Sequence, residues 1–271
     1  DKTTRTRGML IMTLTDQDYE RLCYAKSLLE RPGLAARLTH VVGMPFEKAF
    51  DYLPPKWSGA ITDIARKSLR QVLDVAVKTL DGRERGASKN ALHKFLAVAS
   101  GGVGGAFGLP ALAIELPATT VIMLRSIADI ARSEGEDISS LETRLACLTV
   151  FALGGTSGRD DGAESGYYAV KILLAREVSE AAKYILQRGL VEEGTPALVR
   201  LLTTVASRFG VTVSQKAAAS AVPLLGAAGG ALINSIFMDH FQNMARGHFI
   251  IRSLERQYGP DSVERIYFDA P

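Results

Sequence analysis

Three carboxylates lie close together in a glycine-rich segment at residues 154–168. Asp160, Asp161 and Glu164 fall within five residues, and oxygen ligands at such short, flexible spacing suit calcium or magnesium. The same groups could serve as general acid and base, so a metal-dependent hydrolase is one hypothesis. The alternative is a solvated turn in which Glu164 lies near the positive end of a helix beginning at about Tyr167. We favour the interpretation as a solvated turn, and we expect no metal ion and no cofactor.

The sequence shows no other recognisable catalytic arrangement. It contains no GxSxG, HExxH or GxxxxGK[ST] motif, and no GxGxxG that follows a strand. His240 and His248 are too far apart on one helix to share a metal ion directly. Asp239 precedes His240, but adjacent residues on a helix point in different directions. We therefore expect a protein without catalytic activity.

Two long stretches, residues 95–114 and 217–238, carry no charged side chain. Each is glycine-rich, contains one proline and has small residues at four-residue spacing, such as Gly226 and Gly230, which lets helix backbones approach closely. About 20 residues suffice to cross a bilayer, but glycine, proline and polar residues oppose insertion here. Three interpretations stay open: membrane-spanning helices, a buried helical core with no lipid role, and a membrane-docking hairpin or acyl-chain cavity.

We predict that both stretches meet lipid, as membrane-docking hairpins or as walls of an acyl-chain pocket. Arg208 and Lys216 precede the second stretch and could face anionic headgroups. The candidate lipid-binding residues are Phe95, Val98, Val103, Phe107, Leu109, Leu112, Val222, Leu224, Leu225, Leu232, Ile233 and Phe237.

Ionisable groups also occur in apolar surroundings. Glu115 follows the first uncharged stretch, and Arg125 and Asp129 lie one helical turn apart between apolar residues. Such groups must find a partner or shift their pKa, and Glu115 with Arg125, or Arg125 with Asp129, would provide one. The polar residues that could gate a cavity are Glu115, Arg125, Asp129, Asn234, Asp239 and His240.

The remaining sequence predicts an all-α protein with a single compact multi-helix domain and two interrupted apolar hairpins. Helices are expected over residues 16–30, 56–80, 117–132, 141–153, 167–188, 196–210 and 226–258. Pro117 is expected in the first turn of its helix and Gly210 at the end of its helix, and Ser139 to Glu142 are expected to form a capping box. The expected organisation is an N-terminal helical extension (1–55), the main domain (56–258) and a C-terminal tail (259–271).

The composition of the chain limits which class of partner it is expected to bind and in which cellular compartment it is expected to lie. Charged residues make up 23% of the 271-residue chain and the net charge is only +3, so nothing indicates nucleic acid as a partner. The two cysteines, Cys23 and Cys147, show no metal-site or CxxC spacing, which is typical of a reducing compartment. The apolar run near the N-terminus is too short for a signal peptide. We expect a cytoplasmic protein, peripheral at the inner face of the membrane.

Several segments, spread over most of the chain from Lys56 to Tyr258, resemble the EcsC protein family. They are Leu116 to Thr120, Arg125 to Ala128, Glu142 to Arg144, Phe151 to Gly155 and Gly226 to Asn234. The resemblance implies association with membranes or membrane machinery, without an established reaction or catalytic residues. The expected partner is a membrane lipid or acyl chain, or, alternatively, a membrane transporter for which the protein is an adaptor.

Overall fold

The computed structural model describes residues 14–30, 33–54, 56–78, 108–154, 166–188, 196–222 and 226–271. Within these ranges the chain forms ten α-helices and two short 3-10 helices, and it contains no strand. The predicted all-α fold class is confirmed. The elements are α1 (Asp16–Leu29), α2 (Leu34–Val42), α3 (Phe46–Ala49), η1 (Phe50–Tyr52), α4 (Trp57–Lys78), α6 (Gly108–Ser133), α7 (Leu141–Thr149), η2 (Val150–Ala152), α8 (Gly166–Arg188), α9 (Pro196–Ala221), α10 (Gly226–Tyr258) and α11 (Pro260–Asp269).

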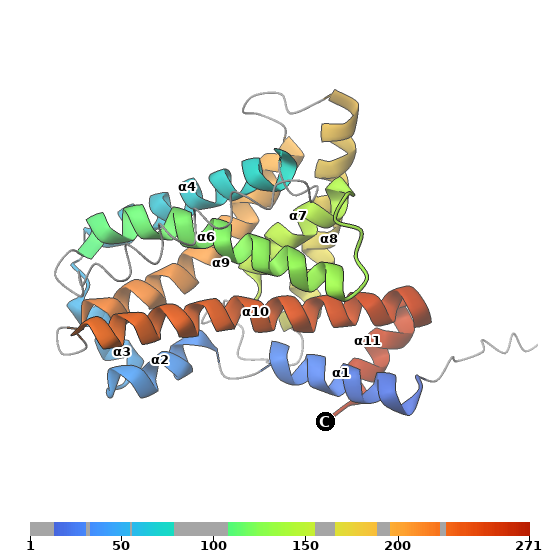
Figure 1. The fold of residues 1–271 in the computed structure, drawn as a ribbon, viewed down its shortest axis with the longest axis horizontal. Helices are drawn as coiled ribbons and strands as arrows, with labels where there is room; N and C mark the ends of the chain where they lie inside the picture. The colour runs from blue at the N-terminus through green and yellow to red at the C-terminus, as the bar shows by residue number, and fades with distance from the viewer. Residues whose placement is uncertain are drawn as a thin grey trace, which may run out of the picture.

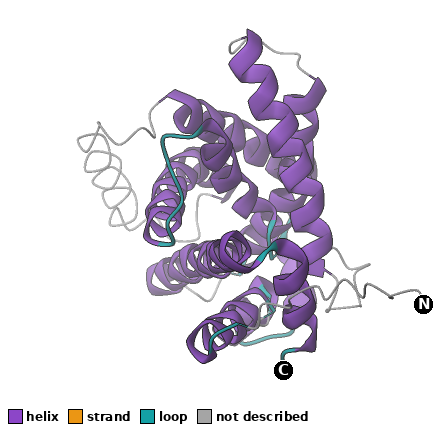
Figure 2. Ribbon diagram, turned by 90° about the vertical axis from the view of Figure 1, so that its right-hand side faces the viewer, coloured by secondary structure: helices purple, strands orange, loops and turns teal. Residues whose placement is uncertain are grey.

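Two long helices, α6 and α10, run side by side in the same direction (Figure 1). The amide of Gln242 donates to the hydroxyl of Ser126 at 2.9 Å, across 116 residues of sequence. Arg252 donates to Glu136, just after α6, across the same separation of 116 residues. The constant offset shows that the two helices are parallel. Helix α4 packs against α6, α9 packs against α4, and the views in Figures 1 and 2 show the helices stacked in layers.

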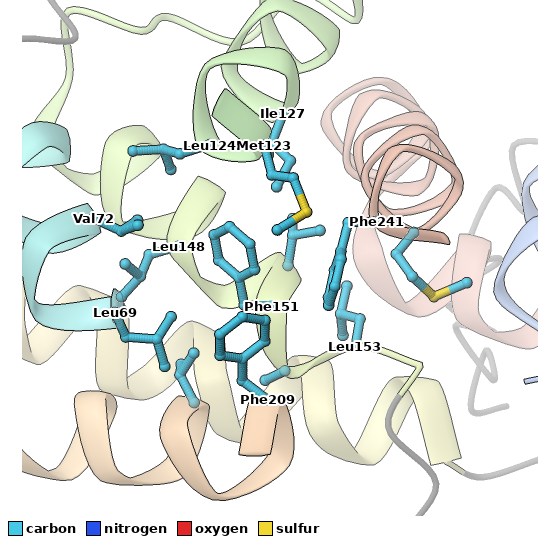
Figure 3. Close-up of a cluster of buried hydrophobic side chains, with 14 of the residues drawn as sticks. Leu69, Val72, Met123, Leu124, Ile127, Leu148, Phe151, Leu153, Phe209 and Phe241 are labelled. Carbon is cyan, nitrogen blue, oxygen red and sulfur yellow. The ribbon is translucent and has the colours of Figure 1, made fainter. Parts of the chain in front are cut away.

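The main core lies where α4, α7, η2, α9 and α10 meet (Figure 3). Phe151 of η2 places its ring 5.2 Å from the ring of Phe209 in α9 and 5.2 Å from that of Phe241 in α10. Helix α4 contributes the apolar stripe that its sequence spacing predicts, including the buried Leu69 and Val72. Burying a large apolar side chain contributes roughly 1.5–3 kcal/mol, so this cluster is the main source of stability in the bundle.

A smaller core lies between α1, the second half of α10 and α11. Leu22 of α1, Leu254 of α10 and Tyr267 of α11 are fully buried there. Residues 260–269, which we expected to be a tail, therefore form a helix that closes the C-terminal end of the chain. The predicted end of α10 is correct, because Gly259 adopts a left-handed conformation (φ 85°) that ends this helix.

The position of Pro117 differs from the prediction. It lies inside α6, not in its first turn. A proline here removes one backbone hydrogen bond and crowds the carbonyl of residue 113. The helix continues because Leu116 and Leu124 are fully buried on either side, and Thr119 and Thr120 donate to backbone carbonyls one turn earlier. Tertiary packing thus overrides a strong local stop signal.

Two further local predictions are wrong. Helix α9 continues through Gly210 to Ala221, because Phe209 and Val213 on either side are buried in the core. The predicted capping box at Ser139 to Glu142 is not formed, because Ser140 precedes α7 without a side-chain capping hydrogen bond and the hydroxyl of Ser139 donates to Asp137. The cap predicted at Thr15 is confirmed, since its hydroxyl accepts from the backbone N–H of Asp18 at 3.1 Å.

The closest described approach of two helices at a glycine occurs at Gly247, where α1 crosses α10. A Cβ added there would lie 2.7 Å from Cγ of Leu29 and 3.0 Å from the backbone oxygen of Ala25. The spacing of Gly226 and Gly230 does not have this role, because a Cβ on Gly230 would meet no described atom within 4 Å. Gly247 lies outside both uncharged stretches, so the sequence search for close helix contacts missed it.

We predict that Gly247→Ala destabilises the protein by about 1–3 kcal/mol, because the backbone of α1 must move to admit a methyl group. Gly210→Ala is the matched control: its Cβ meets no described atom within 4 Å, so it should stabilise α9 by about 0.5–1 kcal/mol. Urea unfolding of both variants and the wild type measures the difference. Equal stability of the two variants would contradict the close packing of α1 on α10.

Candidate functional site

The two uncharged stretches of the sequence flank the same end of the bundle. The first leads into α6 at Gly108, and the second connects the end of α9 at Ala221 with the start of α10 at Gly226. Since α6 and α10 are parallel, both begin at this end, where α9 also finishes (Figure 1). We call this region the three-helix junction and define it by Ile114, Glu115, Lys216, Leu232 and Phe237.

A buried charge holds the three-helix junction together. Lys216 of α9 is only 2% exposed, and its Nζ donates to a carboxylate oxygen of Glu115 in α6 at 2.6 Å. The same Nζ lies 4.9 Å from the centre of the Phe237 ring in α10. Burying an ammonium group is costly unless it is paired, so the carboxylate and the aromatic face together make this position tolerable. One side chain thereby ties α6, α9 and α10.

This pairing differs from those that the sequence indicated. Glu115 bonds to Lys216 and not to Arg125, while Asp129 is exposed and accepts from Arg132 at 2.8 Å. Within the described residues neither carboxylate pairs with Arg125, so the expected pairs are not formed. Lys216 and Arg208 are also not free to face headgroups, since Lys216 is buried and Arg208 donates to the carbonyl of Ala152 at 2.9 Å.

The apolar side chains of the three-helix junction divide into buried and exposed groups. The predicted residues Leu112, Val222, Ile233 and Phe237 are buried in the core. Leu232 is 49% exposed, and Ile114, on the facing stretch of α6, is 68% exposed. The constant offset between α6 and α10 places Leu232 at the level of Leu116 and Ile114 at the level of Gly230. Exposed apolar side chains therefore gather at this end of the two helices.

Several predicted residues lie outside the residues that the structure describes. The backbone of Leu109 belongs to α6, but its side chain is outside the described part of the chain. The others outside it are Phe95, Val98, Val103, Phe107, Leu224, Leu225, Asp160, Asp161 and Glu164. Within the described residues no group of three or more His, Cys, Asp or Glu side chains could hold a metal ion.

The remaining polar candidates lie on α10. Asn234 is half-buried, and Asp239 is exposed and pairs with Arg37 of α2 at 3.6 Å. His240 is buried, and its Nε2 has no hydrogen-bond partner in the described structure. Burial, aided by the charge of Arg37, lowers the pKa of His240 to about 4, so it is neutral at pH 7. Asp239 and His240 thus point in different directions, as expected for helical neighbours.

A separate cleft lies between α7, α8 and α10, and sequence reasoning did not find it. Its volume is about 430 Å³, and it combines an apolar wall with the charged residues Lys171, Arg252, Glu255 and Arg256. The only local signal is the spacing of Arg252, Glu255 and Arg256, three or four residues apart, which places them on one face of α10. Nothing in the sequence indicates that α7 and α8 cover that face.

No described helix is both long and apolar enough to cross a bilayer. A model described as the EcsC protein family matches residues 24–254. The match begins before Lys56, where the resemblance seen in the sequence begins, and it includes α2, whose Leu34 and Leu38 belong to the main core. No curated protein and no solved structure matches the chain.

We predict that Lys216→Met destabilises the protein by about 3 kcal/mol, because it leaves the half-buried carboxylate of Glu115 without its partner. The double variant Lys216→Met with Glu115→Gln should lose much less than the sum of the two single changes, since no unpaired charge then remains. Chemical denaturation of the four proteins gives the coupling energy. Strictly additive losses would show that the two side chains are not coupled.

The two buried histidines of α10 predict a pH dependence of stability. The pKa of His240 is lowered to about 4, and burial lowers the pKa of His248 well below its usual value. Both bind a proton more readily in the unfolded chain, so stability should fall as the pH drops below about 6.5, by at most about 1.4 kcal/mol per pH unit for each. His240→Leu should make the loss between pH 7 and pH 5 smaller, which thermal unfolding measures. An unchanged pH profile in this variant would contradict the assignment.

Proposed function

The chain belongs to the EcsC protein family, and we propose that it is a peripheral membrane-associated protein that binds membrane lipid or an acyl chain through the three-helix junction. The observation that carries the proposal is the exposure of Ile114 and Leu232 at the end of the bundle that both uncharged stretches adjoin. Elsewhere on α6 and α10 the large apolar side chains are mostly buried. Two exposed side chains at one end are where hydrocarbon would make contact.

The energetics favour reversible binding. Fully burying one large apolar side chain contributes roughly 1.5–3 kcal/mol, so Ile114 and Leu232 together give at most a weak anchor. Stable attachment of a protein to a bilayer takes more than one such contribution, which fits a protein that exchanges between the membrane and solution.

The buried pair supports this proposal indirectly. Lys216 and Glu115 hold α6 and α9 together beneath the exposed Ile114, so the apolar surface rests on a fixed base. A charged residue at this depth would be costly next to hydrocarbon, but the pair is shielded by Phe237 and by the surrounding helices. The exposed side chains can therefore contact lipid without exposing the ion pair.

Two other functions predict different behaviour. An adaptor for a membrane transporter would use the same exposed side chains to bind protein helices, so it would not bind vesicles free of protein. A metal-dependent hydrolase built on Asp160, Asp161 and Glu164 would be stabilised by divalent cations. We favour lipid, because Ile114 and Leu232 are exposed at the ends of helices that lie next to, or within, the uncharged stretches of the sequence.

We predict that the wild type floats with protein-free vesicles of phosphatidylglycerol and phosphatidylcholine, and that Ile114→Asp with Leu232→Asp abolishes this. Both side chains are exposed, so the double variant should fold normally. The matched control is Leu186→Asp with Val199→Asp, which places the same two charges at side chains that are 75% and 50% exposed on α8 and α9, and it should float like the wild type. The proposal fails if the wild type does not float, or if all three proteins float equally.

A further inference from the structure

The cleft between α7, α8 and α10 has an apolar wall at one side. This wall is lined by Ala146, Leu153, Leu174, Ala175 and Val178. At about 430 Å³ the cleft lies within the size range of sites for small ligands. It is formed by the second half of α10, whereas the three-helix junction lies at the start of that helix. The cleft and the junction are therefore separate surfaces.

The charged residues of the cleft lining come mainly from α10, and one carboxylate there pairs with two arginines. Glu136 accepts from Nε of Arg252 at 2.8 Å and from Nη2 of Arg252 at 3.1 Å, and it also pairs with Arg256. One carboxylate thus faces two guanidinium groups. Lys171 forms an ion pair with Glu255, so these two charges cancel. The carboxylate of Glu134 bonds to Arg21, away from the cleft arginines. Glu142, which also lines the cleft, adds a third carboxylate whose charge acts on Arg252, so the three cationic and three acidic side chains balance.

One guanidinium nitrogen of Arg252 remains as a possible donor to a ligand. Nε and Nη2 of Arg252 are used by Glu136, while Nη1 has no hydrogen-bond partner among the described residues. Arg256 donates through Nη2 to the carbonyl of Glu134 at 2.7 Å and remains partly exposed. Guanidinium groups match the shape of carboxylates and phosphates, so the free donor suits an anion. Glu142 is the acidic residue of the cleft lining that forms no ion pair among the described residues; it is exposed, and its charge opposes an anion at Arg252.

The charge of Arg252 also reaches His248, a buried residue of the cleft lining whose Nδ1 lies 3.0 Å from the hydroxyl of Tyr167. The pKa of His248 is lowered first by burial and then by the positive charges of Arg252 and Lys171. An anion bound at Arg252 would be attracted by the same guanidinium charge.

We propose that this cleft binds a small amphiphilic carboxylate, with its hydrocarbon part against the apolar wall and its carboxylate at Arg252 and Arg256. A carboxylate can accept from the unused Nη1 of Arg252 while adding only one negative charge to the cleft. A doubly charged phosphate would leave a negative charge unpaired in a half-buried site, which is unfavourable. This site is independent of the proposed membrane contact, because none of its lining residues belongs to the three-helix junction.

The first test blocks the apolar wall. Sodium decanoate is titrated into delipidated protein and binding is followed by calorimetry. Ala175 is an exposed residue of the wall, and Ala175→Trp should fill the cleft and weaken decanoate binding at least tenfold. Ala169 is also an exposed alanine of α8 but does not line the cleft, so Ala169→Trp should bind like the wild type. No binding by the wild type, or equal effects of the two variants, overturns the proposal.

The second test measures how the charges of the cleft and of the ligand affect binding. Arg256→Gln should weaken decanoate binding several-fold, whereas Glu142→Gln should strengthen it, because the latter removes the opposing charge at the rim. Decyl phosphate at pH 8 should bind more weakly than decanoate, and decyltrimethylammonium should not bind. Equal binding of the ammonium compound would show that the cleft recognises only the chain, and the proposal of a carboxylate site would then be wrong. Vesicle flotation by the same variants should be unchanged, which separates this site from the membrane contact.

Discussion

The arrangement of the bundle depends on how charges are paired between α6 and its neighbours. Glu115 near the start of α6 pairs with Lys216 of α9, and Glu136 just after its end pairs with Arg252 and Arg256 of α10. Both carboxylates lie where the surrounding side chains are mostly apolar, so each must keep its partner or lose much of its solvation energy. An apolar interface alone would tolerate sliding by one helical turn. The ion pairs permit one register, and the constant offset between α6 and α10 reflects it.

This register determines which side chains are exposed at each end of the molecule. At the start of α6 and α10, Leu112 and Ile233 turn inward while Ile114 and Leu232 remain at the surface. At the other end of α10, Arg252 and Arg256 are drawn toward Glu136, and α7 and α8 close over them to leave the cleft. The apolar end and the charged cleft are thus two results of one helix pairing, and they are suited to different ligands.

Close contacts away from the ion pairs make the bundle rigid. The rings of Phe151, Phe209 and Phe241 contact one another, so η2, α9 and α10 share one aromatic cluster. Gly247 lets α1 come within contact of α10, which brings the smaller core against the main one. Pro117 is accommodated inside α6 by the burial of its neighbours. Packing on every side therefore supports helices that would be weak by themselves.

The sequence by itself determined the all-α class, the ends of most helices, the apolar stripe of α4 and the membership of the EcsC family. These properties are local, because caps, stops and apolar periodicity act within a few turns of one helix. Only the tertiary structure decided that Glu115 pairs with Lys216, 101 residues away, and that α7 and α8 form a cleft over α10. It also decided that Leu232 is exposed while Ile233 beside it is buried. Spacing in a sequence specifies which residues share a helix face, but the partner of that face is chosen by the packing of all the helices together.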